Sequence, residues 1–479
     1  MTLWTAADAA TATGGWATSD WAVTGISIDT RDIAPGDLFV ALKDVRDGHD
    51  FVAQALEKGA GAALVSRIPD GVAPDAPLLL VDDVLPALER LGAAGRARTQ
   101  AQVIGITGSV GKTSTKEMLR VALARQGKVH AAEKSFNNHW GVPLTLARMP
   151  ADTDFAIIEI GMNHPGEIAP LSRLARPTLA LITTVAEVHL FSFDNLDGIA
   201  REKAAIFDGL EPNGKALIHG DLPVTSILAE AATAAGASPQ QFGTQPGQFC
   251  QINKVTIGND TTVVSAQIAE TPVLFKIMVP GRHLVMNALA CLGVVALLDL
   301  DIALAAQDLA SWSPPDGRGT RLRIGLDQTD PNINFELIND AFNANPTSTA
   351  AALEVLAAAL PTDNVGRIHK GRRIAILGDM LELGSDESAM HLALADLPDL
   401  QSLDQIHCVG PLMRGLYDIL PEEQRGLWVL TAAELAPKLH GLIDAGDVLL
   451  IKGSKGIKVS TLVDATRKLG HPLPTQSEG

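Results

Sequence analysis

The chain has 479 residues, of which 46% are hydrophobic and 19% charged, and its net charge is −17. This length predicts two to four domains, and the composition excludes a disordered protein. The negative charge argues against a nucleic-acid partner, and three separated cysteines without a CxxC pair argue against disulfides or a structural zinc site.

The sequence gives no indication of a membrane protein. Its first residues lack the basic and apolar regions of a signal peptide. The longest apolar run, residues 288–298, is too short to span a bilayer. We therefore expect a cytoplasmic, monomeric protein without membrane insertion.

Three regions of the chain differ in pattern, which predicts three α/β domains. Residues 1–98 hold short strand-like pieces and end in a helix rich in alanine and arginine. Residues 99–313 alternate continuous apolar strands with helices, as in a parallel sheet covered on both faces. Residues 314–479 follow a Ser-Pro-Pro linker and resemble a dinucleotide-fold unit without the GxGxxG motif.

The most informative segment, residues 105–113, opens the second region with Gly-Ile-Thr-Gly-Ser-Val-Gly-Lys-Thr. A strand before it and a helical pattern after it predict a P-loop, whose backbone N–H groups surround phosphate. Lys112 would add positive charge and Thr113 a hydroxyl ligand for Mg²⁺. Where the common Walker pattern has a glycine, this chain has Ile106. The residues expected to bind the nucleotide here are Gly105, Thr107, Gly108, Ser109, Val110, Gly111, Lys112 and Thr113.

Polar residues follow the next strands of the second region. Asn137 and Asn138 lie in a polar loop, where their amides could bind hydroxyls or simply form a turn. Glu159 ends an apolar strand, at the sheet edge where ligands bind, and suits Mg²⁺; a capped surface carboxylate is the alternative. His189 follows the strand at residues 179–184 and could contact a metal or line the cleft.

The later segments of the chain have mostly structural interpretations when each is read by itself. Residues 201–203, Arg-Glu-Lys, look like a solvated charge cluster. Residues 252–280 alternate in hydrophobicity, as in a small antiparallel insertion, and a long apolar helix follows at about residues 284–298. In the third region, Asn345 and the proline after it fit a helix N-cap, and Arg318 lies in a Gly-Arg-Gly loop that suits a phosphate near a hinge.

Taken in order, these motifs resemble those of the Mur ligases of peptidoglycan synthesis over nearly the whole chain. The shared features are the GxxGxxGKT form of the P-loop, Glu-Ile-Gly at 159–161, the histidine after the next strand, Arg-x-Lys at 201–203 and Asn-Ala-Leu-Ala at 287–290. Other segments are similar to those of family members that add D-alanyl-D-alanine to UDP-N-acetylmuramoyl-tripeptide. These segments are residues 29–31, 35–42, 47–51, 137–138, 343–346 and 377–384.

The resemblance implies a fold and a reaction. The fold is α/β with three domains: a central P-loop ATPase domain with a parallel sheet, a small N-terminal domain that binds the UDP-sugar, and a C-terminal Rossmann-like ligase domain. ATP would phosphorylate the terminal carboxylate of the UDP-linked tripeptide. The amine of D-alanyl-D-alanine would then attack the acyl phosphate. ATP and Mg²⁺ are the implied cofactors.

The resemblance also assigns roles to single residues. Lys112, Lys203 and His189 would be catalytic, and Lys203 would carry a carboxyl group from CO₂. Thr113 and Glu159 would hold one Mg²⁺, and the modified Lys203 with His189 a second. This role for Lys203 replaces the solvated interpretation that its local sequence favours.

The remaining implied roles concern the nucleotide and the two other substrates. Asn287 would lie on the adenine side of ATP, Arg318 at a phosphate and Asp340 at the ribose. The residues implied to contact the UDP-sugar, the peptide or the incoming dipeptide are Thr30, Arg31, Asn137, Asn138, Asn343, Asn345 and Asp379.

The chain departs from the family pattern at two places. After His189 the sequence reads Leu-Phe-Ser-Phe in place of Leu-Glu-Gly-Phe, and Phe342 replaces the usual tyrosine, which removes one possible hydrogen bond. A folylpolyglutamate synthase-type ligase would share the P-loop and the acyl phosphate, but the N-terminal segments argue against it. The intact P-loop, Glu159 and Lys203 argue against a nucleotide-binding protein without activity.

Overall fold

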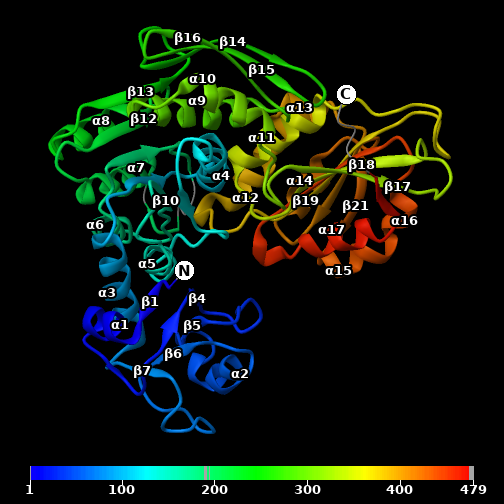
Figure 1. The fold of residues 1–479 in the computed structure, drawn as a ribbon. Helices are drawn as coiled ribbons and strands as arrows, with labels where there is room; N and C mark the ends of the chain where they lie inside the picture. The colour runs from blue at the N-terminus through cyan, green and yellow to red at the C-terminus, as the bar shows by residue number, and fades with distance from the viewer. Residues whose placement is uncertain (1, 188–190, 194, 474–479) are drawn as a thin grey trace.

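The computed structural model describes residues 2–187, 191–193 and 195–473. Within these ranges the chain forms three α/β units, each with its own main sheet, as Figure 1 shows. The N-terminal unit is drawn in blue, the central unit in cyan to green and the C-terminal unit in yellow to red. This arrangement confirms the predicted fold class. No strand crosses residue 98 or residue 313 in the described part, and we retain these positions as the proposed domain boundaries.

The N-terminal unit has a mixed sheet in the order β2-β7-β6-β5-β4, with β1 and β3 paired separately. Its helix α3 (Val84–Ala97), predicted from the sequence, packs against the central unit. A Cβ atom at Gly92 would lie 2.8 Å from a backbone oxygen of helix α5 (Gly141–Ala147), so glycine permits this close approach. The other elements are β1 (Trp4–Thr5), α1 (Ala6–Thr13), β2 (Trp16–Ala17), β3 (Ala22–Val23), β4 (Gly25–Ser27), β5 (Asp37–Val40), α2 (Val52–Glu57), β6 (Ala62–Val65) and β7 (Leu78–Leu80).

The central unit has one large sheet in the order β16-β15-β14-β13-β12-β11-β8-β10-β9. Its strands are β8 (Gln102–Thr107), β9 (Val129–Ala131), β10 (Phe155–Glu159), β11 (Leu179–Ile182), β12 (Lys215–His219), β13 (Pro239–Gly243), β14 (Cys250–Ile257), β15 (Thr262–Ile268) and β16 (Thr271–Ile277). Besides α5, its helices are α4 (Lys112–Leu123), α6 (Ile168–Ala175), α7 (Leu196–Ala204), α8 (Thr225–Ala234), α9 (Arg282–Leu297) and α10 (Ile302–Asp308).

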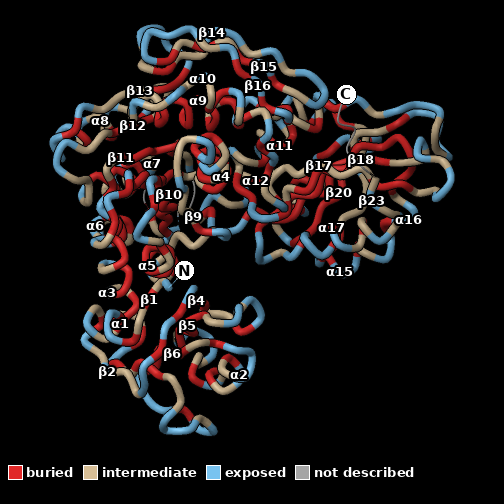
Figure 2. Tube along the Cα trace, viewed as in Figure 1, coloured by how far each residue is buried: buried red, intermediate tan, exposed pale blue. Residues whose placement is uncertain are grey.

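Apolar side chains cover both faces of the parallel part of this sheet. Along β8, Ile104 and Ile106 lie in the cluster on one face, whereas Val103 belongs to the cluster on the other. Figure 2 shows buried residues following the strands of the unit. This two-sided burial explains why these strands read as continuous apolar runs in the sequence.

The predicted antiparallel insertion proves to be part of the central sheet. Strand β14 pairs in parallel with β13, whereas β15 pairs antiparallel with both β14 and β16. Cys250 at the start of β14 is fully buried in the same core as α9. The hairpin therefore extends the sheet, because its inner face shares the apolar core under α9.

Helix α9 contains the apolar run that the sequence marks at residues 288–298. It spans 16 residues, or about 24 Å at 1.5 Å per residue, and packs on the central sheet. Across the described ranges, no helix is both long and apolar enough to cross a bilayer.

The C-terminal unit has a mostly parallel sheet in the order β21-β20-β19-β22-β18-β17-β23, with antiparallel pairing at β17. Its strands are β17 (Thr320–Gly325), β18 (Asn334–Asp340), β19 (Arg373–Gly378), β20 (Gln405–Val409), β21 (Arg425–Val429), β22 (Val448–Lys452) and β23 (His471–Leu473). Its helices are α11 (Pro346–Ala357), α12 (Glu387–Leu392), α13 (Pro398–Gln401), α14 (Met413–Ile419), α15 (Ala432–Leu435), α16 (Leu439–Leu442) and α17 (Ser460–Arg467).

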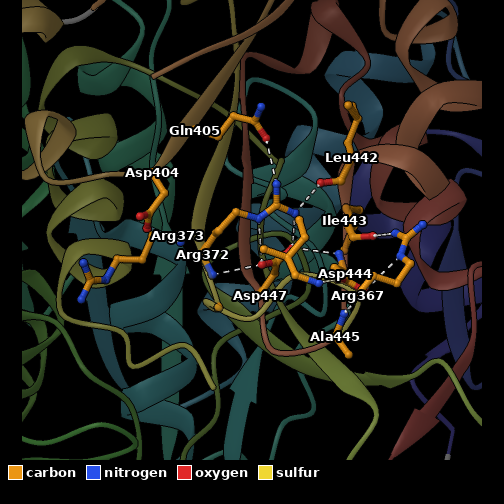
Figure 3. A network of polar contacts seen from close by, with 12 residues as sticks. Arg367, Arg372, Arg373, Asp404, Gln405, Leu442, Ile443, Asp444, Ala445 and Asp447 are labelled. Carbon is orange, nitrogen blue, oxygen red and sulfur yellow. Dashed lines mark hydrogen bonds and ion pairs between the residues drawn. The ribbon is translucent and has the colours of Figure 1, made fainter. Parts of the chain in front are cut away.

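A network of hydrogen bonds and ion pairs lies at the amino ends of β19 and β22, as Figure 3 shows. The Arg372 guanidinium donates to both carboxylate oxygens of buried Asp447, at 3.1 and 2.6 Å. Arg367 donates to buried Asp444 at 3.3 Å. Because the carboxyl ends of these strands lie at the opposite edge, this network stabilises the sheet away from the edge where ligands bind.

Candidate functional site

The loop between β8 and α4 has the geometry that a P-loop requires. Gly108 and Gly111 have positive φ angles of 153° and 88°. A Cβ atom at Gly108 would collide with the Thr183 hydroxyl, and one at Gly111 would lie 2.6 Å from the Asn287 amide oxygen. The Lys112 ammonium group donates to the Gly108 carbonyl at 2.5 Å, which places the charge across the loop. Glycine is therefore required at both positions.

The segment after β11 holds the loop in place. The Ser109 hydroxyl donates to the Ala186 carbonyl at 3.0 Å, and the Thr183 hydroxyl donates to the Val110 carbonyl at 2.6 Å. Gly105 and Thr107 lie within β8, and a Cβ atom at Gly105 would lie 3.0 Å from a proline side chain. Packing thus explains the glycine at 105, and its predicted contact with the nucleotide stays a proposal.

Glu159 lies beside the P-loop at the carboxyl end of β10 and is 3% exposed. The Thr113 hydroxyl donates to its two carboxylate oxygens at 3.0 and 3.1 Å. The Asn137 amide donates to the same carboxylate at 2.9 Å, and Ser135 Oγ lies 3.0 Å from Thr113 Oγ1. The carboxylate is therefore buried and oriented, so the alternative of a capped surface side chain is wrong.

Two basic side chains, Lys112 and Arg318, interact electrostatically with this carboxylate, and buried Lys203 lies near Lys112. Burial lowers the pKa of Lys112, and Arg318 lowers it further, whereas Glu159 raises it. The pKa of Lys203 lies well below its usual value because of burial and the nearby Lys112 charge. Burial also lowers the pKa of Arg318, against the opposing effects of Glu159 and Asp340. A cationic pocket in a protein of net charge −17 fits a polyphosphate ligand.

The predicted charge cluster at residues 201–203 divides into three environments. Arg201 is exposed, as the solvated interpretation predicts. Glu202 accepts hydrogen bonds from two backbone N–H groups at the start of α6, at 2.8 and 3.0 Å. Lys203 is only 2% exposed, so the solvated interpretation is wrong for it. Two residues along a helix differ by about 200° in direction, which puts Lys203 on the buried face opposite Arg201.

The C-terminal unit contributes the opposite wall of the site. Asp340 ends β18 and Lys452 ends the neighbouring parallel strand β22. The Lys452 ammonium group donates to Asp340 at 2.6 Å and to the Asn343 carbonyl at 3.0 Å. The Arg318 guanidinium lies 4.1 Å from the Phe342 ring centre and donates to Ser135 of the central unit at 3.2 Å. Arg318 thus contacts the central unit beside the P-loop, and Asp340 lies close enough to Arg318 to interact with its charge.

A cavity lies between the central and C-terminal units, and its lining includes His283, Leu284, Arg318, Asp340 and Val355. Desolvation, followed by the Lys452 charge, lowers the pKa of His283 to about 4. His283 and Lys452 are absent from the predicted site residues. Lys452 could have been found, because it ends a parallel strand as Glu159 does.

The predicted UDP-sugar residues lie in the N-terminal unit. The Thr30 side chain is buried and donates to Gln54 at 3.0 Å. Arg31 is exposed and pairs with the neighbouring Asp29 at 2.6 Å. Lys134 of the central unit forms an ion pair with Asp32, two residues after Thr30. This contact joins the predicted UDP-sugar loop to the loop that carries Asn137.

Some predicted substrate residues also have structural roles. Asn138 accepts from the backbone N–H of Gly141, the first residue of α5, at 2.9 Å, as the turn interpretation predicts. Asn345 is the N-cap of α11 and forms a capping box, which confirms that interpretation. Asp379 accepts from the backbone N–H of Met413 at 2.8 Å, at the start of α14. Asn343 is exposed. Direct substrate contacts of these residues stay proposals.

The donor set at the P-loop fits a nucleotide-bound Mg²⁺. In the described ranges, no group of three or more His, Cys, Asp or Glu side chains could hold a metal ion by itself. Thr113 and Glu159 supply two hard oxygen donors, and phosphate oxygens and water usually complete the shell of Mg²⁺. The second Mg²⁺ site, predicted at Lys203 and His189, stays a prediction, because His189 lies outside the described residues.

Three family models cover most of the chain. Residues 22–96 match the one described as Mur ligase family, catalytic domain; residues 106–295 the Mur ligase middle domain; and residues 328–455 the Mur ligase, glutamate ligase domain. The UDP-N-acetylmuramoyl-tripeptide–D-alanyl-D-alanine ligase of Rickettsia prowazekii is 33% identical over 443 residues, which cover 92% of this chain and 94% of the relative. The chain belongs to the Mur ligase family.

Solved structures agree with this Mur ligase assignment. A crystal structure of MurF from Acinetobacter baumannii has a TM-score of 0.80 and 29% identity, covering 97% of this chain and 99% of that chain. Folylpolyglutamate synthase of Mycobacterium tuberculosis has a TM-score of 0.60 and 18% identity, covering 81% and 95%, a likeness of fold alone. This Mur ligase is therefore an enzyme of the ligase class, with the three units that its family models describe.

Proposed function

We propose that this Mur ligase uses ATP to join D-alanyl-D-alanine to the terminal carboxylate of a UDP-N-acetylmuramoyl-tripeptide, a step of peptidoglycan precursor synthesis. A relative that carries the name of this activity is 33% identical over 92% of the chain, which supports the substrate assignment. The observation that carries the chemistry is the oriented Thr113–Glu159 pair beside Lys112.

The reaction needs an activated carboxylate, because a carboxylate ion is a poor electrophile. A carboxylate oxygen attacks the γ-phosphorus of ATP, and ADP leaves. The amine of the dipeptide then attacks the carbonyl carbon of the acyl phosphate, loses a proton, and inorganic phosphate leaves with the transferred oxygen. Lys112 and Arg318 stabilise the negative charge on the phosphoryl group during both transfers.

Thr113 and Glu159 would hold Mg²⁺ when the nucleotide is bound, and the hydrogen bond from Asn137 orients the Glu159 carboxylate. A bound Mg²⁺ would neutralise charge on the phosphate oxygens. The buried position of Glu159 supports this role, because its carboxylate is fixed before a ligand arrives.

Lys203 is the proposed site of carboxylation. A lysine amine reacts with CO₂ only when it is neutral, and the lowered pKa of Lys203 favours the neutral form. Its nitrogen bonds to the carbon of CO₂ and releases a proton, which gives a carbamate anion. The neighbouring Lys112 cation stabilises that anion. With His189, the carbamate would hold a second Mg²⁺ near the acyl phosphate.

The nucleotide lies between the central and C-terminal units in this proposal. Asn287 is on its adenine side, Arg318 at a phosphate and Asp340 at the ribose. Arg318 and Asp340 both line the cavity between the two units, and the Asn287 amide lies beside Gly111 of the P-loop, which supports this placement. The residues proposed to contact the UDP-sugar, the peptide and the dipeptide are Thr30, Arg31, Asn137, Asn138, Asn343, Asn345 and Asp379.

The reaction is placed in the cytoplasm, where ATP and nucleotide-linked precursors are found. We propose a monomer as the active form. Closure of the three units around the substrates would keep water from the acyl phosphate.

A comparison of two substrate pairs tests the proposed function. ADP release is measured with UDP-N-acetylmuramoyl-tripeptide plus D-alanyl-D-alanine, and separately with folate plus glutamate. We expect turnover with the first pair alone, and none in a Lys112→Ala variant. Turnover with only the folate pair would exclude the proposal, and ADP release that neither pair stimulates would indicate an ATPase without ligase activity.

A further inference from the structure

Ser135 connects the P-loop to the C-terminal unit, although it is absent from the predicted site residues. Its hydroxyl oxygen lies 3.0 Å from Thr113 Oγ1 and 3.2 Å from Arg318 Nη2. Thr113 lies in the first turn of α4, the helix that follows the P-loop. Arg318 lies just before β17, the first strand of the C-terminal unit. The Ser135 side chain therefore contacts two units at the candidate nucleotide site.

The direction of these hydrogen bonds follows from the number of protons available. The Thr113 hydroxyl has one proton, and it donates to Glu159, because an ionised carboxylate can only accept. Thr113 must then accept from Ser135. Ser135 in turn accepts from Arg318, which can only donate. The bonds form one chain, from Arg318 through Ser135 and Thr113 to Glu159.

The surrounding structure fixes the position of Ser135. The fully buried Lys116 of α4 donates to the carbonyl groups of Ala132 and Lys134, just before Ser135. On the other side, the Phe136 ring packs edge-to-face on Trp140, with ring centres 5.6 Å apart. The hydroxyl is thus held by the central unit, independently of Arg318.

Arg318 has a second contact, with the Phe342 ring at 4.1 Å. Phe342 belongs to the C-terminal unit, so this contact orients the guanidinium only within its own unit. The hydrogen bond to Ser135 joins the same guanidinium to the central unit, where the charge of Glu159 also acts on it.

We propose that Ser135 is a positioning residue that aligns Arg318 of the C-terminal unit with the P-loop, and thereby strengthens nucleotide binding. The proposal rests on the proposed function only in assigning Arg318 to a nucleotide phosphate. Removal of the Ser135 hydroxyl removes the hydrogen bond from Arg318 to the central unit and leaves the contact with Phe342 and the charges of Glu159 and Asp340, so the guanidinium spends less time over the phosphates.

Calorimetric titration with Mg²⁺-ADP tests this role without any peptide substrate. We expect Ser135→Ala to weaken ADP binding about tenfold, the effect of losing one hydrogen bond to a charged group. Ser135→Thr keeps the hydroxyl and should stay within about twofold of the wild type. In turnover assays, the alanine variant should raise KM for ATP more than it lowers kcat.

A double-mutant cycle with Arg318→Met separates positioning from general damage. If Ser135 acts through Arg318, Ser135→Ala has little further effect on ADP binding in the Arg318→Met background. Should the alanine variant be unstable, Ser135→Cys keeps the size of the side chain and weakens its hydrogen bonds. Unchanged ADP affinity in folded variants, or equal losses in both backgrounds, would overturn the proposal.

The two proposals fail in different ways. A wild-type protein that binds ADP and loses affinity with Ser135→Ala, yet forms no amide product, would contradict only the proposed function. If the wild type and Ser135→Ala both form the product, and their KM values for ATP are equal, only the role of Ser135 is contradicted.

Discussion

The carboxylate of Asp340 and the ammonium group of Lys452 lie 2.6 Å apart at the carboxyl ends of two neighbouring parallel strands. Lys452 is 2% exposed. Burial raises the pKa of Asp340, while Lys452 and Arg318 oppose this change. A buried pair of this kind stabilises the protein only while both partners are present. The pair thereby joins the carboxyl ends of β18 and β22 beside the cavity that Asp340 lines.

Lys452→Met should destabilise the protein by about 3 kcal/mol, because it leaves the Asp340 carboxylate buried without its partner. The double variant Asp340→Asn with Lys452→Met should lose less, since it removes both charges. Urea unfolding measures the difference. Lys455→Met, at an exposed lysine three residues away, is the matched control. A Lys452→Met protein as stable as this control would contradict the proposed dependence on the pair.

Lys203→Ala should reduce ligase activity by about 100-fold or more, because it removes the amine that we propose is carboxylated. Added formate or acetate should restore part of the activity by supplying a carboxylate in the space that is left. Arg201→Ala, an exposed position on the same helix, should remain active. Full activity of Lys203→Ala without any additive would remove the proposed role.

Glu159→Gln should remove most of the dependence of ADP affinity on Mg²⁺. The amide keeps the shape of the side chain but loses the charge that a Mg²⁺ ion requires. We expect Mg²⁺ to tighten ADP binding at least about tenfold in the wild type and much less in the variant, measured by calorimetry at several Mg²⁺ concentrations. Glu230→Gln, at an exposed glutamate of α8, is the control. An identical response to Mg²⁺ in Glu159→Gln and the wild type would place the metal elsewhere.

His407 should make stability depend on pH. Burial, and then the Arg372 charge, lower the pKa of this fully buried histidine to about 4. Between pH 6.5 and 4 the unfolded chain binds more protons at this site than the folded protein, so stability falls as the pH falls. The contribution is complete above pH 6.5 and amounts to about 3 kcal/mol.

Urea unfolding of His407→Asn between pH 7.5 and 4.5 checks this expectation. The variant should lose less stability over that range than the wild type, whatever its stability at pH 7.5. His440→Asn, at an exposed histidine, should follow the wild type. Equal pH slopes in all three proteins would show that His407 does not titrate as described.

The parts of the fold that could be predicted depend on local patterns. Continuous apolar runs predict the parallel strands because both faces of the central sheet are buried. The P-loop could be predicted because its glycines, lysine and threonine are adjacent in sequence. The extension of the central sheet by β14 was missed, since alternation in a strand does not show which strand it pairs with.

The parts of the site that could not be predicted depend on tertiary contacts. Lys203 directly follows two charged residues in the sequence, and its burial follows from the face of α7 that packs inward. Ser135 and Arg318 are 183 positions apart, so no motif joins them. The pair of Asp340 and Lys452 requires the order of the strands in the C-terminal sheet, which brings β22 beside β18.

The fate of a labelled oxygen tests the central claim most directly. UDP-N-acetylmuramoyl-tripeptide with ¹⁸O in its terminal carboxylate is incubated with the enzyme, ATP, Mg²⁺ and D-alanyl-D-alanine. Mass spectrometry then examines the released phosphate and the peptide product. Our account predicts a product that has gained the dipeptide, and one ¹⁸O atom in each released phosphate, because the carboxylate oxygen leaves with the phosphoryl group. Phosphate without ¹⁸O, released while the tripeptide remains unchanged, would contradict it.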